Sequence, residues 1–300
     1  MKVCLIGCVE FSASALRTIF SLEQEGVCSV VGVITKASSG FNADFADLSE
    51  VVEEAGRPSG LVHYCENQAK AADFISSGNA DIVFCFGWSS LLGPALLASA
   101  PRGVIGFHPA QLPENRGRHP IIWALALGLE QTASTFFRMD EGADSGPILS
   151  QELIAIDPTD NARSLYRKIT ETALKQVDLF TRALAQGSES FSEQDHSRAT
   201  YWRKRSPADG LVDWRMPSND IHNLVRALYH PYPGAEFHYD ANPVKLWSTR
   251  LAPGHWPGNL EPGKVLEKLN GNVLVKCGAN TALWLCEFEP QVELNAGNYL

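Results

Sequence analysis

The sequence has no surplus of positive charge. Its 300 residues carry 25 lysines and arginines against 34 aspartates and glutamates, which gives a formal net charge of −9. The net charge is −6 over residues 1–100, −3 over 101–200 and zero over 201–300. No third of the chain therefore offers the broad positive field that binding of a long polyanion needs. The composition argues against a nucleic acid as partner.

Three other features are missing. No apolar run approaches the roughly 20 residues of a membrane-spanning helix, and the start MKVCLIGCVEF is typical of a first strand and not of a signal peptide. The seven cysteines include no Cys-x-x-Cys and no nearby histidine pair, which argues against a metal and favours reduced thiols. The turn Gly7-Cys-Val-Glu10 lacks the Gly-x-Gly-x-x-Gly spacing of a dinucleotide site. These absences predict a soluble, cytoplasmic protein.

Strand and helix patterns alternate in the first half of the chain. Buried strands are expected over 3–7, 30–35 and 81–86, with a helix over 14–25 capped by Ser12 and a polar loop over 37–45. Such alternation predicts an α/β fold with a mostly parallel, Rossmann-like sheet. A long apolar periodicity over 162–184 predicts the helix that closes this domain.

Short strand patterns follow a polar segment in the last third of the chain. A helix is expected over 218–228, and strands are expected over 244–248, 264–267, 272–276 and 282–286. We therefore predict two domains, 1–185 and 206–300, joined by a linker over 186–205. The second domain is smaller and β-rich, of the OB or barrel type.

Polar residues that are costly to bury gather between Gly103 and Gln151. The apolar run 104–107 ends in His108-Pro109, and because proline stops the strand, an imidazole is expected at a strand end. A second extended run leads into the turn Asp140 to Gly146, whose acids and glycines suit a sharp loop beside a pocket. Two strand ends can thus bring His108 and Asp144 together. Singly, each residue is more often structural than catalytic.

The joint pattern resembles that of a known family. The order His-Pro-x-x-Leu-Pro, Arg-Gly-Arg, Pro-x-x-Trp and Met-Asp-x-Gly-x-Asp-x-Gly is similar to that of formyltransferases that use 10-formyltetrahydrofolate. A second stretch, Trp202 to Trp214 followed by Asn223-x-x-Arg226-Ala227 and Pro231-Tyr-Pro-Gly-Ala235, is similar to their carboxyl-terminal part. Two ordered motifs are more specific than either alone.

The resemblance implies a reaction and a role for each site residue. An amine attacks the formyl carbon of the folate donor, a tetrahedral oxyanion forms, and the bond to the donor nitrogen breaks. His108 would polarise the formyl oxygen, and Asp144 would take the amine proton directly or through a water. The family has an asparagine two positions before the histidine, where this chain has Gly106. Loss of such a donor costs about 2.7–4 kcal/mol of barrier, so we expect another donor in its place.

The resemblance also implies binding residues. A loop after the strand 81–86 would border the pterin, and the alternative for this loop is an ordinary strand-to-helix turn with a half-buried tryptophan. The substrate's phosphate or carboxylate would meet Arg116, Arg118 and His119. The expected folate contacts are Phe86, Gly87, Trp88, Leu91, Met139, Asp140 and Glu141.

These features predict an enzyme that moves a formyl group from 10-formyltetrahydrofolate to the amine of a nucleotide-linked amino sugar, without a metal. The acidic chain, the Arg-Gly-Arg-His-Pro and Pro-Tyr-Pro-Gly-Ala stretches and the lack of an obvious tRNA-binding insertion favour the sugar. Alternatives within the class are formylation of methionyl-tRNA and of an amine in natural-product assembly. Hydrolysis of 10-formyltetrahydrofolate and folate binding without catalysis are alternatives of other classes. The sequence also leaves a homodimer open.

Overall fold

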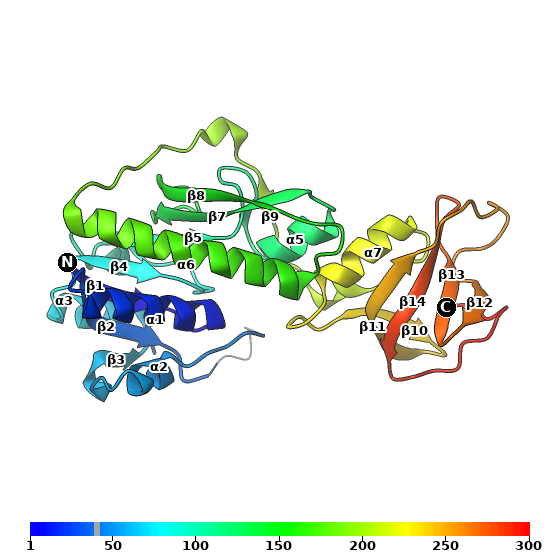
Figure 1. Cartoon of the computed structure of the whole chain (residues 1–300), viewed down its shortest axis with the longest axis horizontal. Helices are drawn as coiled ribbons and strands as arrows, with labels where there is room; N and C mark the ends of the chain where they lie inside the picture. Colours follow the sequence, from blue (N-terminus) through cyan, green and yellow to red (C-terminus); the bar gives the residue numbers. More distant parts are fainter. Residues whose placement is uncertain (39–42) are drawn as a thin grey trace. The chain divides into compact units, whose positions relative to one another are not determined.

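The chain divides into two compact units (Figure 1). The computed structural model describes residues 1–38 and 43–300, so part of the loop predicted over 37–45 lies outside the described residues. The first unit holds residues 1–117, 132–154 and 167–202, and the second holds 118–131, 155–166 and 203–300. The domain boundaries predicted at 185 and 206 stay a prediction.

A seven-stranded sheet in the order β3-β2-β1-β4-β5-β7-β8 forms the centre of the first unit. The pairs from β3 to β5 are parallel, whereas β5 and β7 are antiparallel. This confirms the predicted mostly parallel sheet. The strands are β1 (Lys2–Ile6), β2 (Ser29–Thr35), β3 (Val62–Tyr64), β4 (Ile82–Cys85), β5 (Val104–His108), β7 (Gln131–Arg138) and β8 (Ile148–Ala155).

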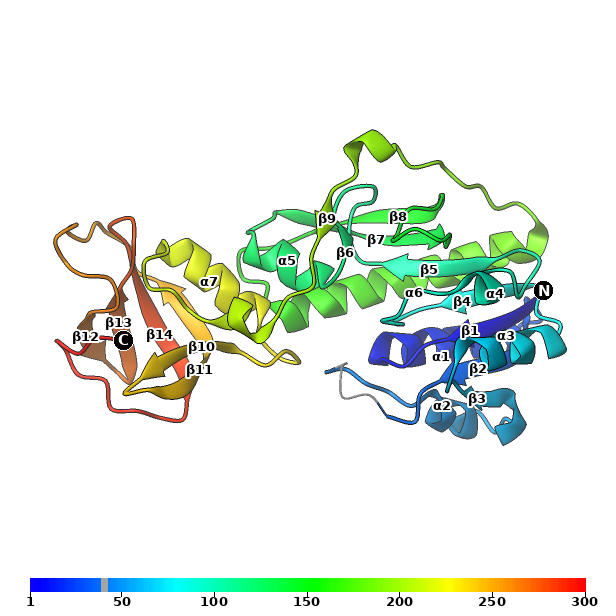
Figure 2. The same ribbon diagram turned by 180° about the vertical axis from the view of Figure 1, so that it is seen from behind.

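Helices cover both faces of this sheet, which explains why its central strands are continuous apolar runs (Figures 1 and 2). On one face, the ring of Phe180 lies 5.5 Å from that of Phe84, and the ring of Phe11 lies 5.8 Å from that of Phe86. On the other face, Ile75 and its neighbours pack against the alternate residues of β4. The helices are α1 (Glu10–Gln24) and α6 (Ala162–Gln186) on the first face, α3 (Gln68–Ser77) and α4 (Pro94–Leu97) on the second, and α2 (Leu48–Glu54) beside α1.

The predicted cap at Ser12 is wrong, because helix α1 begins at Glu10, four residues before the expected start at residue 14. Val9 is the N-cap residue, and Ser12 lies inside the first turn. The buried Ser12 hydroxyl accepts the N–H of Val9 at 3.3 Å and donates to the backbone oxygen of Phe86 at 2.6 Å. The serine therefore ties the start of α1 to the end of β4.

The segment after α6 packs against the first unit. Ser192 forms a bridge with Ile148, and β9 (Tyr201–Trp202) pairs in parallel with β6 (Arg116–Gly117). A short 3-10 helix, η2 (His196–Arg198), lies between these two contacts, and another, η1 (Ser59–Leu61), precedes β3. This segment is polar in composition, yet its backbone follows a defined path and pairs with residues 116–117.

The second unit contains a five-stranded antiparallel sheet in the order β10-β11-β14-β13-β12, which confirms the predicted small β-rich domain. Helix α7 (Ser218–Ala227) packs against β11 and also against α5 (Pro120–Ala126). No helix within residues 1–38 and 43–300 is long and apolar enough to cross a membrane. The remaining elements are η3 (Pro207–Gly210), β10 (Ala235–Tyr239), β11 (Asn242–Leu251), β12 (Val265–Leu269), β13 (Asn272–Lys276) and β14 (Ala282–Glu289).

Candidate active site

His108 is the last residue of β5, and its side chain is buried with 4% of the residue exposed. Its Nε2 lies 2.8 Å from the backbone oxygen of Asn115. A carbonyl oxygen can only accept a hydrogen bond, so Nε2 carries a proton in both the neutral and the charged ring. Nδ1 is therefore the nitrogen that can gain or lose a proton without breaking this contact.

Asp144 lies in the turn between β7 and β8, beside that nitrogen. Its Oδ2 is 3.5 Å from Nδ1 of His108 and accepts a 2.8 Å hydrogen bond from the backbone N–H of Gly117. A carboxylate and an imidazole nitrogen in this arrangement are placed to act on one reacting group as base and as hydrogen-bond donor.

The path that brings the two residues together differs from the expected one. Because β7 is antiparallel to β5, its last residue Arg138 pairs with Ile105, whereas His108 pairs with Thr135. The last residues of the two strands, His108 and Arg138, therefore lie at opposite ends of the paired region. The turn after β7 returns along β5 and carries Asp144 back to the histidine.

The turn that carries Asp144 is strained at that residue. Asp144 has a left-handed backbone with a φ of 54°, which costs a residue other than glycine on the order of 1–2 kcal/mol. Oδ1 of Asp140 accepts the N–H of Gly142 at 2.9 Å and the hydroxyl of Ser145 at 2.6 Å, and these bonds close the turn. Strain of this kind persists only where the surrounding structure holds it.

The space beside Gly106 is filled by apolar side chains. A Cβ on Gly106 would lie 2.7 Å from Cγ and 3.0 Å from Sδ of Met139, and 3.1 Å from Cζ of Phe137. A thioether and a phenyl ring are not hydrogen-bond donors. Neither side chain therefore supplies the donor that was expected to replace the asparagine.

Replacing Gly106 by asparagine should destabilise the protein by about 1–3 kcal/mol, as overpacking of a filled interior does. The free energy of unfolding in urea measures this, and turnover should not rise. Gly60→Asn is the matched control, because nothing lies within 4 Å of a Cβ on Gly60. Adding Met139→Ala to Gly106→Asn should restore most of the loss. A Gly106→Asn variant as stable as the parent would show that the space is open.

The loop after β4 lies at the same edge of the sheet as His108. Cys85 pairs with Gly106, so Gly87 and His108 are each two residues beyond this pair. Lys36 Nζ lies 4.5 Å from the centre of the Trp88 ring, and the Nε1 of that tryptophan is buried without a partner among the described residues. A buried N–H without an acceptor is costly, and a bound polar molecule would satisfy it.

The remaining residues of the expected folate set differ in exposure. Phe86 is fully buried in the aromatic core, whereas Leu91 is 68% exposed at the far end of the same loop. Met139 is partly buried against Gly106, and Asp140 and Glu141 are exposed at the start of the turn that carries Asp144. The loop and this turn are therefore the two polar segments that border the residues around His108.

Two family models together match most of the chain. A family model described as formyl transferase matches residues 1–179, and a model of the formyl transferase carboxyl-terminal domain matches residues 204–298. The chain belongs to the formyltransferase family. The first part of the motif pattern lies within residues 1–179, and the second part, which begins at Trp202, lies within 204–298 from its third residue on.

Solved structures share the fold of this formyltransferase. WlaRD, a sugar 3N-formyltransferase solved with dTDP and 5-N-formyl-THF, is 15% identical over 97% of this chain and 99% of its own, with a TM-score of 0.71. An N-formyltransferase from Helicobacter canadensis in complex with folinic acid and dTDP-3-aminofucose is 15% identical over 95% of this chain and 98% of its own, with a TM-score of 0.73. HypX from Aquifex aeolicus in complex with tetrahydrofolic acid is 16% identical over 96% of this chain and 44% of its own, with a TM-score of 0.65.

The three residues predicted to bind substrate differ in how deeply they are buried in this formyltransferase. Arg116 is 2% exposed, and its guanidinium bonds to Gln194 and Tyr201 within the first unit. This burial does not favour contact with a substrate. Arg118 and His119 are in the second unit and are partly buried.

His119 is placed to act as a neutral donor. Its Nδ1 accepts the N–H of Arg205 at 3.3 Å, so the proton of the neutral ring is on Nε2. Burial, and after it the charges of Arg118 and Arg205, lower the pKa of His119. The ring is therefore neutral at neutral pH, and its free Nε2–H can donate to an oxygen of a ligand.

Sequence reasoning missed three residues that contact the His108–Asp144 pair. Asn115 bonds to His108 and Gly117 to Asp144 through backbone atoms, which no side-chain pattern reveals. Gln194 bonds to the backbone of Asp144 from 50 residues away in sequence. In the sequence, the glycine of the Arg-Gly-Arg motif is the one indication that the backbone makes a close contact here.

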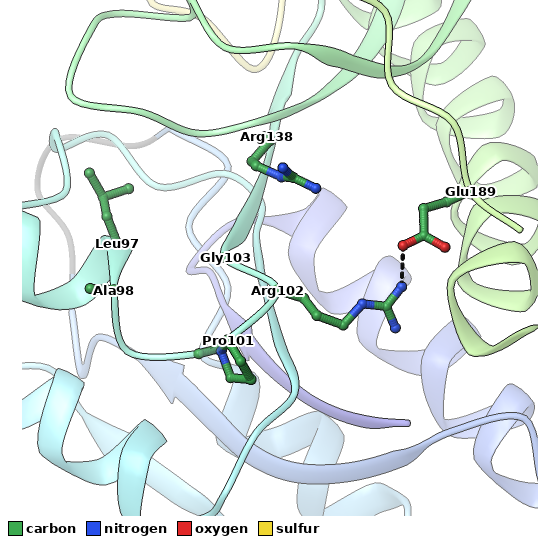
Figure 3. A pocket seen from close by; sticks show the side chains of 8 residues that line it. Leu97, Ala98, Pro101, Arg102, Gly103, Arg138 and Glu189 are labelled. Atoms are coloured by element: carbon green, nitrogen blue, oxygen red, sulfur yellow. Dashed lines mark hydrogen bonds and ion pairs between the residues drawn. The ribbon is translucent and has the colours of Figure 1, made fainter. Parts of the chain in front are cut away.

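A hollow of about 550 Å³ lies elsewhere in this formyltransferase (Figure 3). Gly103 on its wall precedes β5, whereas His108 ends that strand, so five residues or about 16 Å of strand separate the two. An ion pair between Arg102 and Glu189 closes one side. The hollow is therefore distinct from the candidate active site, and it is lined by Leu97, Ala98, Ala100, Pro101, Arg102, Gly103, Arg138 and Glu189.

Proposed function

We propose that this protein transfers a formyl group from 10-formyltetrahydrofolate to a primary amine on a nucleotide-linked amino sugar. The observation that carries the proposal is the pair of His108 and Asp144, whose Nδ1 and Oδ2 atoms lie 3.5 Å apart next to the Gly117 N–H. Family membership supplies the reaction class.

The roles of the two residues follow from their contacts. The amine nitrogen bonds to the formyl carbon, and the bond from that carbon to the donor nitrogen breaks. With its ring protonated, His108 donates through Nδ1 to the formyl oxygen, because the Nε2–H is already bonded to Asn115. Asp144 accepts the proton that the amine loses, and that proton returns to the departing donor nitrogen. The Gly117 N–H holds the carboxylate in place during this exchange.

The residues around the loop after β4 fit a folate donor. Folate supplies the one-carbon group, and its pterin presents hydrogen-bonding edges on a flat ring. The unpartnered Trp88 Nε1 is a buried donor that could bond to such an edge, and Gly87, Leu91 and Met139 complete the same border. Asp140 and Glu141 lie on the exposed side, where they can accept hydrogen bonds.

A nucleotide-linked sugar as the acceptor is supported by the solved structures of the same fold. Two of them are described with dTDP or with dTDP-3-aminofucose bound. The acidic composition adds to this, because a tRNA would meet a net charge of −9. We assign contact with the substrate phosphates to Arg118 and His119, and not to the buried Arg116.

A single-turnover assay tests the proposal. The protein is mixed with 10-formyltetrahydrofolate alone, with dTDP-linked 3-amino and 4-amino sugars, with UDP-linked amino sugars, or with methionyl-tRNA. Formyl release that needs an amino sugar supports the proposal. Release without any amine indicates hydrolysis, release only with methionyl-tRNA indicates that substrate, and no release contradicts an enzymatic role.

We also propose that the protein works in the cytoplasm. All seven cysteines are thiols outside any disulfide, and five of them are buried, which suits the reducing cytoplasm. A homodimer is the second expectation to test, and sedimentation at micromolar concentration measures it directly.

A further inference from the structure

Gln194 joins the turn of Asp144 to a buried arginine. The side chain is 6% exposed, and its Nε2 donates to the backbone oxygens of Asp144 at 2.9 Å and of Gly146 at 2.6 Å. Its Oε1 accepts from Nη2 of Arg116 at 2.7 Å. Arginine only donates and carbonyls only accept, so these partners determine the orientation of the amide.

Arg116 holds Gln194 in this orientation. Its Nη1 donates to the Tyr201 hydroxyl at 2.9 Å, and Nη2 lies 3.1 Å from Nδ1 of His196. Both terminal nitrogens of this guanidinium, which is 2% exposed, are therefore bonded, whereas its Nε is buried without a partner among the described residues. Loss of either terminal contact would leave a further buried donor unpaired, so the arginine and the amide bonded to it have little freedom to move.

The backbone next to Arg116 contacts both members of the catalytic pair. The Asn115 oxygen bonds to His108, and the Gly117 N–H bonds to Asp144. A Cβ on Gly117 would lie 2.3 Å from the Trp202 oxygen, and its φ is 106°, so only glycine fits this close approach. The backbone of Asn115 and Gly117 and the side chains of Arg116 and Gln194 thus hold the pair, and we call these four residues the clamp.

We infer that Gln194 is a positioning residue that holds the left-handed backbone of Asp144, so that Oδ2 faces His108. One of the two carbonyls that it bonds belongs to Asp144, the residue with the strained backbone, and the other belongs to Gly146, two residues later. Without these donors, two carbonyl oxygens lose their partner and the turn is free to relax to a less strained backbone. The inference rests on the proposed function in one respect, which is that Asp144 accepts the amine proton.

Gln194→Glu tests this with little disturbance of the fold. The glutamate has the same shape and keeps an acceptor for Arg116, but it places an oxygen where Nε2 donated to the carbonyls. We expect kcat to fall about hundredfold with each KM changed less than about threefold, because small misplacement of a reacting group has this effect. Exchange of the Gly117 amide hydrogen should become about tenfold faster as its bond to Asp144 loosens.

Arg198→Gln is the matched control. The exposed ion pair of Arg198 with Glu114, at 2.6 Å, joins residues that neighbour the clamp in sequence, but it includes no clamp residue and no member of the catalytic pair. The kcat of the Arg198→Gln variant and its Gly117 exchange rate should match those of the parent protein. An equal loss in this control would mean that any loosening between these neighbouring segments slows the reaction, and it would overturn the specific role of Gln194.

The outcomes separate this inference from the proposed function. An active parent, an inactive Asp144→Asn variant and an unimpaired Gln194→Glu variant with unchanged Gly117 exchange would overturn the inference alone. A parent without formyl transfer, in which Gln194→Glu still accelerates Gly117 exchange, would overturn the function and leave the positioning role standing. Hydrogen exchange therefore decides the inference whatever the assay shows.

Discussion

Replacing Asp144 by asparagine should lower kcat for formyl transfer by about 10²–10⁴-fold, the range that a general base contributes. The amide has the shape of the carboxylate and can still accept the Gly117 N–H, but it cannot take the amine proton. KM should change less than about threefold, because the change removes a proton acceptor and not a binding contact.

A control variant makes this test more specific. Glu152→Gln is the control, since it neutralises an exposed carboxylate on β8. A rate within tenfold of the parent in Asp144→Asn would remove Asp144 from the mechanism.

The sheet and the position of His108 could be predicted because both depend on local pattern. The apolar run before His108 and the proline after it specify a strand and its end, and the structure ends β5 at this residue. The same kind of reasoning misplaced the cap of α1. Ser12 has the chemistry of a cap, but its hydroxyl is used between Val9 and Phe86, a contact that only the packed sheet creates.

The environment of the pair could not be predicted, because it depends on contacts between distant segments. The sequence indicates a tight turn around Asp144, but not that β7 runs antiparallel to β5 and that the turn must return along the strand. Gln194 lies 50 residues from Asp144 and 78 from Arg116, inside a segment whose composition is that of a linker. The sequence predicts Arg116 as a phosphate ligand because an arginine in a loop is usually exposed. Only the fold shows that this arginine is buried.

The filled space beside Gly106 changes what the site requires of His108. Met139 and Phe137 occupy the position of the expected asparagine amide, and neither can donate a hydrogen bond to the formyl oxygen. Stabilisation of the oxyanion then depends more on His108 than it would in a site with two side-chain donors. Removal of the imidazole should therefore have a severe effect.

His108→Ala should lower kcat by about 10²–10³-fold, the loss that follows removal of one oxyanion donor. The truncation leaves a cavity in a buried position, which added imidazole can enter. We expect millimolar imidazole to restore part of the rate in this variant and to have no effect on the parent. Such rescue separates a chemical role from a structural one, because a misfolded site would not recover.

His255→Ala, at an exposed histidine of the second unit, provides the control and should keep the parent's kcat. His108→Gln adds a second comparison. Its amide can still donate to the Asn115 oxygen, so the fold around residue 115 is kept while Nδ1 is lost. If Nδ1 donates to the formyl oxygen, the glutamine variant should be nearly as slow as the alanine variant although its stability matches the parent. A glutamine variant with the parent's kcat would show that His108 serves only to hold Asn115, and the polarising role would have to pass to another group.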